Sequence, residues 1–187
     1  MGSVVSYSIP QIGAGRNIEY GWKGVLLVSV ASVKEYFSQF GMEERVRELE
    51  ESSATVELAA AALGCEPARI AKTLSFMVGE EPILIVAAGD AKVDNAKYKA
   101  YFHQKAKMLT PQQAIDLVGH PVGGVCPFAV KEGVWVYLDE SLKRFHTVFP
   151  ACGSGNSAIE LTIPELEETS RFKEWADVCK GWQTENL

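Results

Sequence analysis

One lysine of this chain, Lys72, occupies a position from which it could take part in chemistry. It stands in the segment 70–74 (IAKTL), at the start of an apolar run that predicts a β-strand. A lysine there keeps its aliphatic stem near the core and carries its ammonium group to the end of the sheet, where a cleft can use it as a point charge toward a phosphate or a carbonyl. The alternative is an edge lysine that only reaches solvent, and position alone favours neither interpretation.

Two glycine-rich segments could present main-chain groups to the same ligand. Residues 119–127 hold three glycines and two prolines between a predicted helix and a predicted strand, and residues 151–157 enter another predicted strand. Exposed N–H groups in such loops can bind a developing oxyanion, and one such donor contributes on the order of 3 kcal/mol in other enzymes. Each segment by itself could be an ordinary connection, but together they could line one pocket.

Nucleophilic catalysis by a cysteine is a further possibility that the sequence leaves open. Cys126 or Cys152 could supply the thiolate, and His103, His120 or His146 the base, but no spacing orients a thiol toward an imidazole. Free cysteines are more often small core residues. The four cysteines form no C-x-x-C pair and have no histidine at zinc spacing, so we expect no metal site and reduced thiols, as in the cytoplasm.

Composition and charge limit the classes of protein and partner. Of 187 residues, 47% are hydrophobic and 22% are charged, which excludes a disordered or disulfide-stapled chain. The formal net charge is -6, so a polyanion would need a local patch, and residues 69–107, with seven basic and four acidic residues, provide one. An ordinary solvated face would look the same. The apolar run 25–30 is too short for a membrane span, and we expect no membrane partner.

The pattern of apolar and capping residues predicts an α+β domain with a mixed, mostly antiparallel central sheet. Residues 1–31 read as an extension or an extra edge strand, and 32–187 as one domain. We expect helices at 32–40, 43–51, 56–63, 90–101, 110–119 and 171–180, with another opening at Thr162 and a helical turn at 141–145. Ser32, Thr55 and Thr110 are the expected N-terminal caps of three of these helices. We expect strands at 73–78, 82–87, 128–130, 134–138, 147–149 and 158–163. No G-x-G-x-x-G follows a strand, so a dinucleotide-binding fold is disfavoured.

In their order and spacing, several of these segments resemble the YbaK/prolyl-tRNA synthetase-associated domain family. The resemblance covers about residues 32–168. Its markers are the segment 53–55 (SAT) before an alanine-rich helix, 70–74 (IAKTL), 89–90 (GD) followed by 93–94 (VD) and Lys97, the pattern G-x-x-x-G-G-x-x-P over 119–127, and 153–161 ending in 159–161 (IEL). Ala129 departs from the pattern, because many relatives have a further glycine there.

The resemblance implies a fold, an activity and a set of site residues. The fold would be a partly barrel-like sheet surrounded by helices, and the activity hydrolysis of the ester that joins a wrongly attached amino acid to the 3′-terminal ribose of tRNA. The substrate's own 2′-hydroxyl would assist, and no cofactor would be needed. Lys72, Gly123 and Gly124 would be catalytic. Substrate contacts would come from Gly119, His120, Val125, Cys126, Pro127, Asp94, Lys97, Ser154 and Asn156.

These implications define a leading hypothesis and two rivals. The leading hypothesis is a trans-editing deacylase that acts on small amino acids in the cytoplasm, as a monomer or weak homodimer, with the 3′ end of aminoacyl-tRNA as ligand and an aminoacyl-tRNA synthetase as a possible partner. The first rival is a non-catalytic module that binds aminoacyl-tRNA or aminoacyl-adenosine without turnover. The second is a cysteine-dependent hydrolase. His120 could select the size of the amino acid or could stabilise the loop that contains it.

Overall fold

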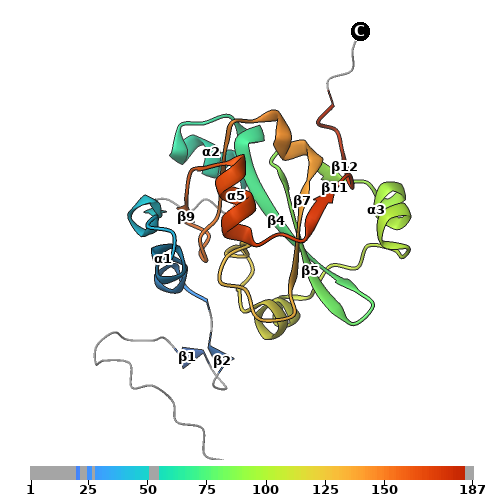
Figure 1. Ribbon diagram of the computed structural model, residues 1–187, viewed down its shortest axis with the longest axis horizontal. Helices are drawn as coiled ribbons and strands as arrows, with labels where there is room; N and C mark the ends of the chain where they lie inside the picture. The colour runs from blue at the N-terminus through green and yellow to red at the C-terminus, as the bar shows by residue number, and fades with distance from the viewer. Residues whose placement is uncertain (1–19, 22–24, 27, 51–54, 184–187) are drawn as a thin grey trace, which may run out of the picture.

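A six-stranded mixed sheet forms the centre of the molecule (Figure 1). The computed structural model describes residues 20–21, 25–26, 28–50 and 55–183. The strand order is β10-β8-β4-β5-β7-β11. The strands span Leu161–Thr162 (β10), Thr147–Pro150 (β8), Ile70–Val78 (β4), Glu81–Ala88 (β5), Trp135–Asp139 (β7) and Glu174–Ala176 (β11). Pairing is antiparallel for β10–β8 and β4–β5, and parallel for β8–β4, β5–β7 and β7–β11.

Three two-stranded sheets, all antiparallel, complete the β structure of the described residues. They pair Tyr20–Gly21 (β1) with Val25–Leu26 (β2), Arg47–Glu48 (β3) with Ser157–Ala158 (β9), and Lys92–Val93 (β6) with Cys179–Lys180 (β12). Antiparallel pairs therefore outnumber parallel pairs, and the main sheet curls into part of a barrel. The predicted α+β class with a mixed, partly barrel-like sheet is confirmed.

Helices flank the sheet, with α1 and α3 at opposite sides of it in Figure 1. The helices are Val30–Ser38 (α1), Val56–Leu63 (α2), Asn95–Phe102 (α3), Pro111–Gln113 (α4) and Ile163–Ser170 (α5), and shorter helical turns are Glu43–Arg45 (η1), Pro67–Arg69 (η2), Ala114–Val118 (η3) and Glu140–Arg144 (η4). The predicted caps are confirmed at three helix starts, where Thr55, Thr110 and Thr162 accept a main-chain N–H through their side chains.

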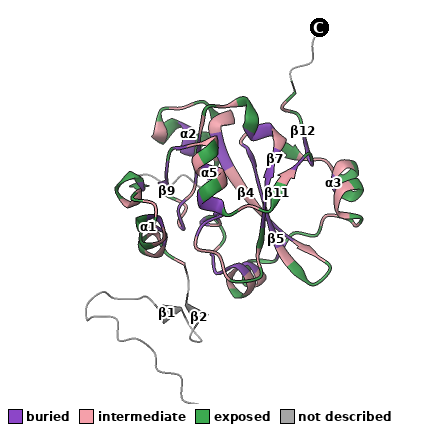
Figure 2. Ribbon diagram, in the orientation of Figure 1, coloured by how far each residue is buried: buried purple, intermediate pink, exposed green. Residues whose placement is uncertain are grey.

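Strand β5 lies between β4 and β7, and its residues 83–88 are all buried (Figure 2). Residues 84–88 have no exposed surface at all. A strand buried on both faces reads as a continuous apolar run and not as an alternating one, which is the pattern of PILIVAA in the sequence. The β4–β5 hairpin thus forms a rigid support for anything held along β4.

Three predicted elements are wrong, two of them because tertiary pairing overrides a local pattern. The helix expected at 43–51 is the short turn η1 followed by β3, whose neighbour Leu49 donates its N–H to the Asn156 carbonyl. The strand expected at 128–130 is irregular, with Ala129 at a φ of 51°. The helix expected at 171–180 is replaced by β11 and β12, since Arg171 adopts a φ of 48° and ends α5.

Two helix boundaries also differ from expectation, the strand expected at 158–163 is divided between β9 and β10, and part of one prediction lies outside the described residues. Helix α1 begins before Ser32, because Ser29 is its N-cap and Ser32 is the reciprocal partner in a capping box. Helix α3 begins after Asp94 and not at residue 90, since β6 intervenes. Of the proposed extension 1–31, residues 1–19, 22–24 and 27 are not described, and β1 and β2 pair only with each other. The division at residue 31 stays a prediction.

Candidate functional site

A cavity of about 440 Å³ lies between helix α2, strand β4 and the two glycine-rich segments. Most of its wall is apolar. Val56, Ala59 and Leu63 of α2 face Ile70 of β4 and Phe149 of β8, and Ala59, Ile70 and Phe149 belong to a small hydrophobic cluster separate from the main core. The cavity is therefore built where α2 covers one end of the sheet.

Lys72 lies in the wall of this cavity and is the one ionisable group among the described residues that line it. Its Nζ donates to the Gly89 carbonyl at 2.9 Å. The side chain is half-buried, and this burial lowers the pKa of Lys72 from its ordinary value. An ammonium group carries three N–H donors, so the bond to Gly89 anchors the lysine and leaves capacity for a ligand oxygen. The arrangement places a cation against an otherwise neutral cavity.

The two glycine-rich segments meet at this cavity, so together they do line one pocket. Gly123 and Val125 line it from one side, and Ser154 and Gly155 from the other. A Cβ on Gly124 would lie 2.5 Å from the carbonyl oxygen of Gly153, so the two backbones pack directly on each other. Gly123 has a φ of 89°, a conformation that favours glycine, but a Cβ there would meet nothing within 4 Å. Gly124 thus joins the loops, whereas Gly123 shapes the cavity wall.

Ser154 and Asn156 have different positions within the second segment. Ser154 lines the cavity, and its Oγ donates to Asn156 Oδ1 at 2.7 Å and lies 2.9 Å from Ser157 Oγ. Asn156 does not line the cavity; its Nδ2 donates to the Leu49 carbonyl at 3.1 Å. Asn156 therefore ties the segment to the β3 region, while Ser154 is the member that a ligand could contact.

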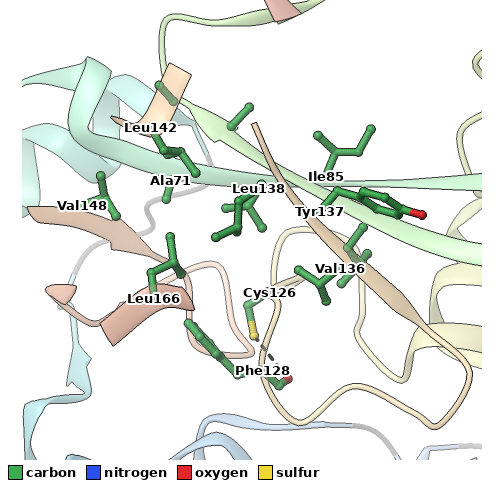
Figure 3. Packing of buried hydrophobic residues seen from close by; sticks show 14 of the residues in the cluster. Ala71, Ile85, Cys126, Phe128, Val136, Tyr137, Leu138, Leu142, Val148 and Leu166 are labelled. Carbon is green, nitrogen blue, oxygen red and sulfur yellow. Dashed lines mark hydrogen bonds between the residues drawn. The ribbon is translucent and has the colours of Figure 1, made fainter. Parts of the chain in front are cut away.

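His120 and Cys126 lie in the core beneath the first loop and do not line the cavity. Both have no exposed surface; Phe128 O accepts from His120 Nε2 at 3.0 Å, and Cys126 Sγ is 3.8 Å from His120 Nδ1. Figure 3 shows Cys126 among Phe128, Leu138 and Leu166. Burial lowers the pKa of His120 to about 4 and raises the pKa of Cys126 to about 12. Both shifts oppose the thiolate and imidazolium forms that a nucleophilic pair requires.

The remaining predicted contact residues lie away from the cavity. Asp94 caps α3 by accepting from the Ala96 and Lys97 N–H groups, and its ion pair with Lys180 lowers its pKa to about 2. Lys97 Nζ pairs with Asp177 at 2.7 Å. Neither lines the cavity, and neither do Gly119, which ends η3 at a φ of 96°, and Pro127. Of the predicted set, the structure brings together Lys72, Gly123, Val125 and Ser154.

The sequence gives no direct signal for the apolar wall and rim of the cavity. Helix α2 contributes to the wall, and Met108 and Val122 form part of the lining while remaining 59% and 67% exposed. An alanine-rich helix next to an apolar strand signals close packing but not a cavity. Exposed apolar residues often mark a binding surface, yet their exposure cannot be read from a sequence.

Among the described residues, no group of three or more His, Cys, Asp or Glu side chains is placed to hold a metal ion. In the same part of the chain, no helix has the length and apolar character that a membrane crossing requires.

Comparison with known proteins gives consistent similarities. Residues 50–169 match the sequence profile of the aminoacyl-tRNA editing domain. An uncharacterised protein of Bacillus subtilis, YwhH, is 56% identical over 157 residues, which is 83% of this chain and all of that protein. A proline–tRNA ligase of Thermosipho melanesiensis is 28% identical over 76% of this chain, a match that spans 25% of the ligase. A crystal structure described as a candidate trans-editing enzyme for prolyl-tRNA synthetase superimposes with a TM-score of 0.74 and 27% identity, over 81% of this chain and 97% of the other.

Proposed function

Because the chain belongs to the aminoacyl-tRNA editing domain family, we propose that it is a free-standing deacylase that hydrolyses the ester of aminoacyl-tRNA mischarged with a small amino acid. The observation that carries this proposal is the common cavity. Lys72 and Gly123, which are far apart in the sequence, line one space together with Ser154. The superposition on the candidate trans-editing enzyme extends over 97% of that enzyme's chain, which supports a domain that works outside a synthetase.

The ester between an amino acid and ribose is already activated, so its hydrolysis requires only a positioned water and groups that stabilise the developing negative charge. Water adds to the acyl carbon, the bond to the ribose 3′-oxygen breaks, and that oxygen takes a proton. Lys72 is suited to hold negative charge on the acyl oxygen or on the terminal phosphate, because it faces an apolar cavity in which a charge interaction is weakly screened. The neighbouring 2′-hydroxyl of the substrate is held close to the reacting atoms and can assist proton transfer.

Selectivity for small amino acids follows from the wall of the cavity. Leu63, Ile70 and Phe149 are contributed by three different elements, and a rigid apolar wall excludes large side chains by steric overlap. Exclusion of larger groups is physically easier than rejection of smaller ones, which still fit. The cavity therefore acts as a sieve whose limit is set by packing of α2 against the sheet.

The docking surface for the tRNA body is the basic segment 69–107. Arg69 and Lys97 are engaged in ion pairs with Glu160 and Asp177, whereas no ion pair is found for Lys99, Lys105 or Lys107 among the described residues. Phosphate contacts by such lysines release counterions, so tRNA binding should weaken steeply between 50 and 200 mM salt. Binding that is insensitive to salt would contradict this assignment of the docking surface.

A panel of mischarged tRNAs tests the proposed activity. Each tRNA carries a different amino acid of increasing size and is incubated with the full chain in the presence of a chelator. Release of alanine or another small amino acid, with none from leucyl or phenylalanyl esters, is the expected result. Affinity for the same tRNAs without any release would overturn the enzymatic proposal in favour of a binding module.

A further inference from the structure

Strand β4 has an open stretch on the edge that faces away from β5. On that edge β8 pairs only with Ile70 and Ala71, and the next neighbour is Met108, which forms an isolated antiparallel bridge with Phe76. Between these two partners, no strand of the described residues pairs with β4 on this side. The sheet is therefore split for a few residues, and the split lies beside the cavity, which Lys72, Thr73 and Leu74 line.

The hydrogen bonds around the split fix which main-chain groups it exposes. The Ser75 carbonyl accepts from Leu109 N at 3.0 Å, and Met77 N donates to the Lys107 carbonyl at 2.9 Å, so both residues direct their main-chain groups away from β5. Main-chain direction alternates along a strand, and the β4–β5 register runs without a bulge. The N–H and C=O of Thr73, two residues before Ser75, must therefore also point away from β5.

A second bond on the other strand supports the same assignment. Ala88 stands opposite Ala71 in the β4–β5 register, yet its N–H donates to Ser141 Oγ at 3.1 Å. The pair Ala71 and Ala88 is thus not a hydrogen-bonded pair, and neither is Thr73 with its partner Val86, which lies two positions along. One donor and one acceptor of Thr73, spaced as in a β-ladder, therefore face the split beside Lys72.

The charge of the cavity narrows the class of ligand that this edge would bind. No carboxylate is found among the described residues that line it. An α-amino group that entered would find only neutral acceptors there, such as main-chain carbonyls and hydroxyls. An amino acid in ester or amide linkage carries an N–H donor and a C=O acceptor at the spacing of one strand residue, which is complementary to Thr73.

We propose that the aminoacyl group binds as a single added residue of the sheet and fills the split at Thr73. The Thr73 carbonyl accepts from the α-amino group, and the Thr73 N–H donates to the acyl oxygen, as two residues do in a hydrogen-bonded antiparallel pair. This inference rests on the proposed function and deepens it. Recognition of groups common to all amino acids is assigned to β4, and selection by size to the apolar walls. The acyl oxygen is thereby held next to Lys72.

Hydrolysis-resistant ligands test this inference without turnover. The pair is 3′-deoxy-3′-(L-alanylamino)adenosine and its 3′-propionylamino counterpart, which lacks only the amino group. Calorimetry on the full chain should give at least about tenfold tighter binding of the alanyl compound, as loss of a hydrogen bond that leaves a buried acceptor unpaired would cost. Equal affinity for the two compounds, or no measurable binding of either, would overturn the proposed pairing of the aminoacyl group with Thr73.

Amide hydrogen exchange locates the contact. In the free protein the Thr73 amide should exchange at least about tenfold faster than the amides of Lys72 and Leu74, which point into the β5 ladder and serve as internal controls. Saturation with the alanyl compound should slow Thr73 at least tenfold and leave the two controls unchanged. A Thr73 amide that is already protected, or that does not respond to the bound ligand, would contradict the inference. If the pairing with Thr73 is found but mischarged tRNA is not hydrolysed, only the enzymatic proposal fails.

Discussion

Two regions of the molecule contain side chains that could take part in catalysis: the cavity beside Lys72, and the buried pair of Cys126 and His120. They differ in whether a substrate can reach them. Both adjoin the same loop, 119–127, yet Lys72 faces a space large enough for a ligand while Cys126 and His120 have no exposed surface. Burial lowers the pKa of Lys72 and of His120 and raises the pKa of Cys126, and each change favours the neutral form of the side chain. Only Lys72 remains in a position to meet a substrate. Reactive residue types near a glycine-rich loop are therefore insufficient evidence for a site without the access that packing decides.

Substitution of the cavity lysine tests the active side of this comparison and should have the largest effect. Lys72→Ala removes the one ionisable group found among the described residues that line the cavity, and we expect deacylation to fall at least about 100-fold, as for loss of a charge that stabilises a developing anion. The fold should remain, because the Lys72 side chain is only half-buried and lines a cavity, so little apolar packing is lost with its stem. Lys143→Ala, on the surface turn η4 and paired with Glu140, is the control. Unchanged turnover in folded Lys72→Ala would remove this lysine from the mechanism.

The burial of His120 should make the stability of the protein depend on pH. Because the pKa of His120 is lowered to about 4 in the folded state from about 6.5 in the unfolded chain, the unfolded state binds more protons between these values. The contribution of neutral His120 to the free energy of unfolding is therefore fully present above about pH 6.5. It should decline by about 3 kcal/mol as the pH falls toward 4. Chemical denaturation of the wild type and of His120→Asn at several pH values measures the slope. A variant that keeps the full slope would show that another group causes it.

Gly124, which packs the two glycine-rich segments together, should contribute more to the free energy of unfolding than Gly133, where a Cβ would meet open space. Gly124→Ala places a methyl group 2.5 Å from a backbone oxygen of the second loop, so we expect a loss of about 2 to 3 kcal/mol and a distorted cavity. Gly133→Ala is the matched control for a glycine whose side is open, since a Cβ there meets nothing within 4 Å and only its φ of 86° is unfavourable. Its cost should be about 1 kcal/mol. Equal costs in thermal or denaturant unfolding would argue against backbone packing at Gly124.

Several parts of the fold could be predicted from the sequence because local chemistry determines them. Thr55, Thr110 and Thr162 cap helices as expected, and the apolar runs on either side of residues 79–81 form the β4–β5 hairpin. The segments that could not be predicted are those in which distant pairing decides the conformation. Acidic residues 43–51 have a helical composition, but β3 pairs with β9, more than 100 positions away. The end of the chain likewise adds β11 to β7 in parallel, a contact that no local pattern signals.

The site was predictable to a similar extent. Lys72 and the glycine-rich segments could be identified because charge at a strand start and clustered glycines are visible in a sequence. The placement of Asp94 and Lys97 could not, since ion pairs with Lys180 and Asp177 hold them beside β12. His120 could not be assigned either, because its burial depends on the packing of Phe128 and neighbouring core residues. Residue type therefore suggested the chemistry, and only tertiary packing decided which residues share the cavity.

Thiol alkylation should have the smallest effect, and it tests directly whether the buried cysteines are closed to reagents and substrate. Cys126, Cys152 and Cys179 have no exposed surface, and burial raises the pKa of each thiol, so the native protein should resist iodoacetamide at all three. Cys65 is partly exposed and should be the site of labelling. Deacylase activity should be retained after native labelling, as mass spectrometry and the tRNA assay together would show. Rapid modification of Cys126 with parallel loss of activity would instead mean that the buried pair opens to substrate, and the cysteine-dependent mechanism would replace the one centred on Lys72.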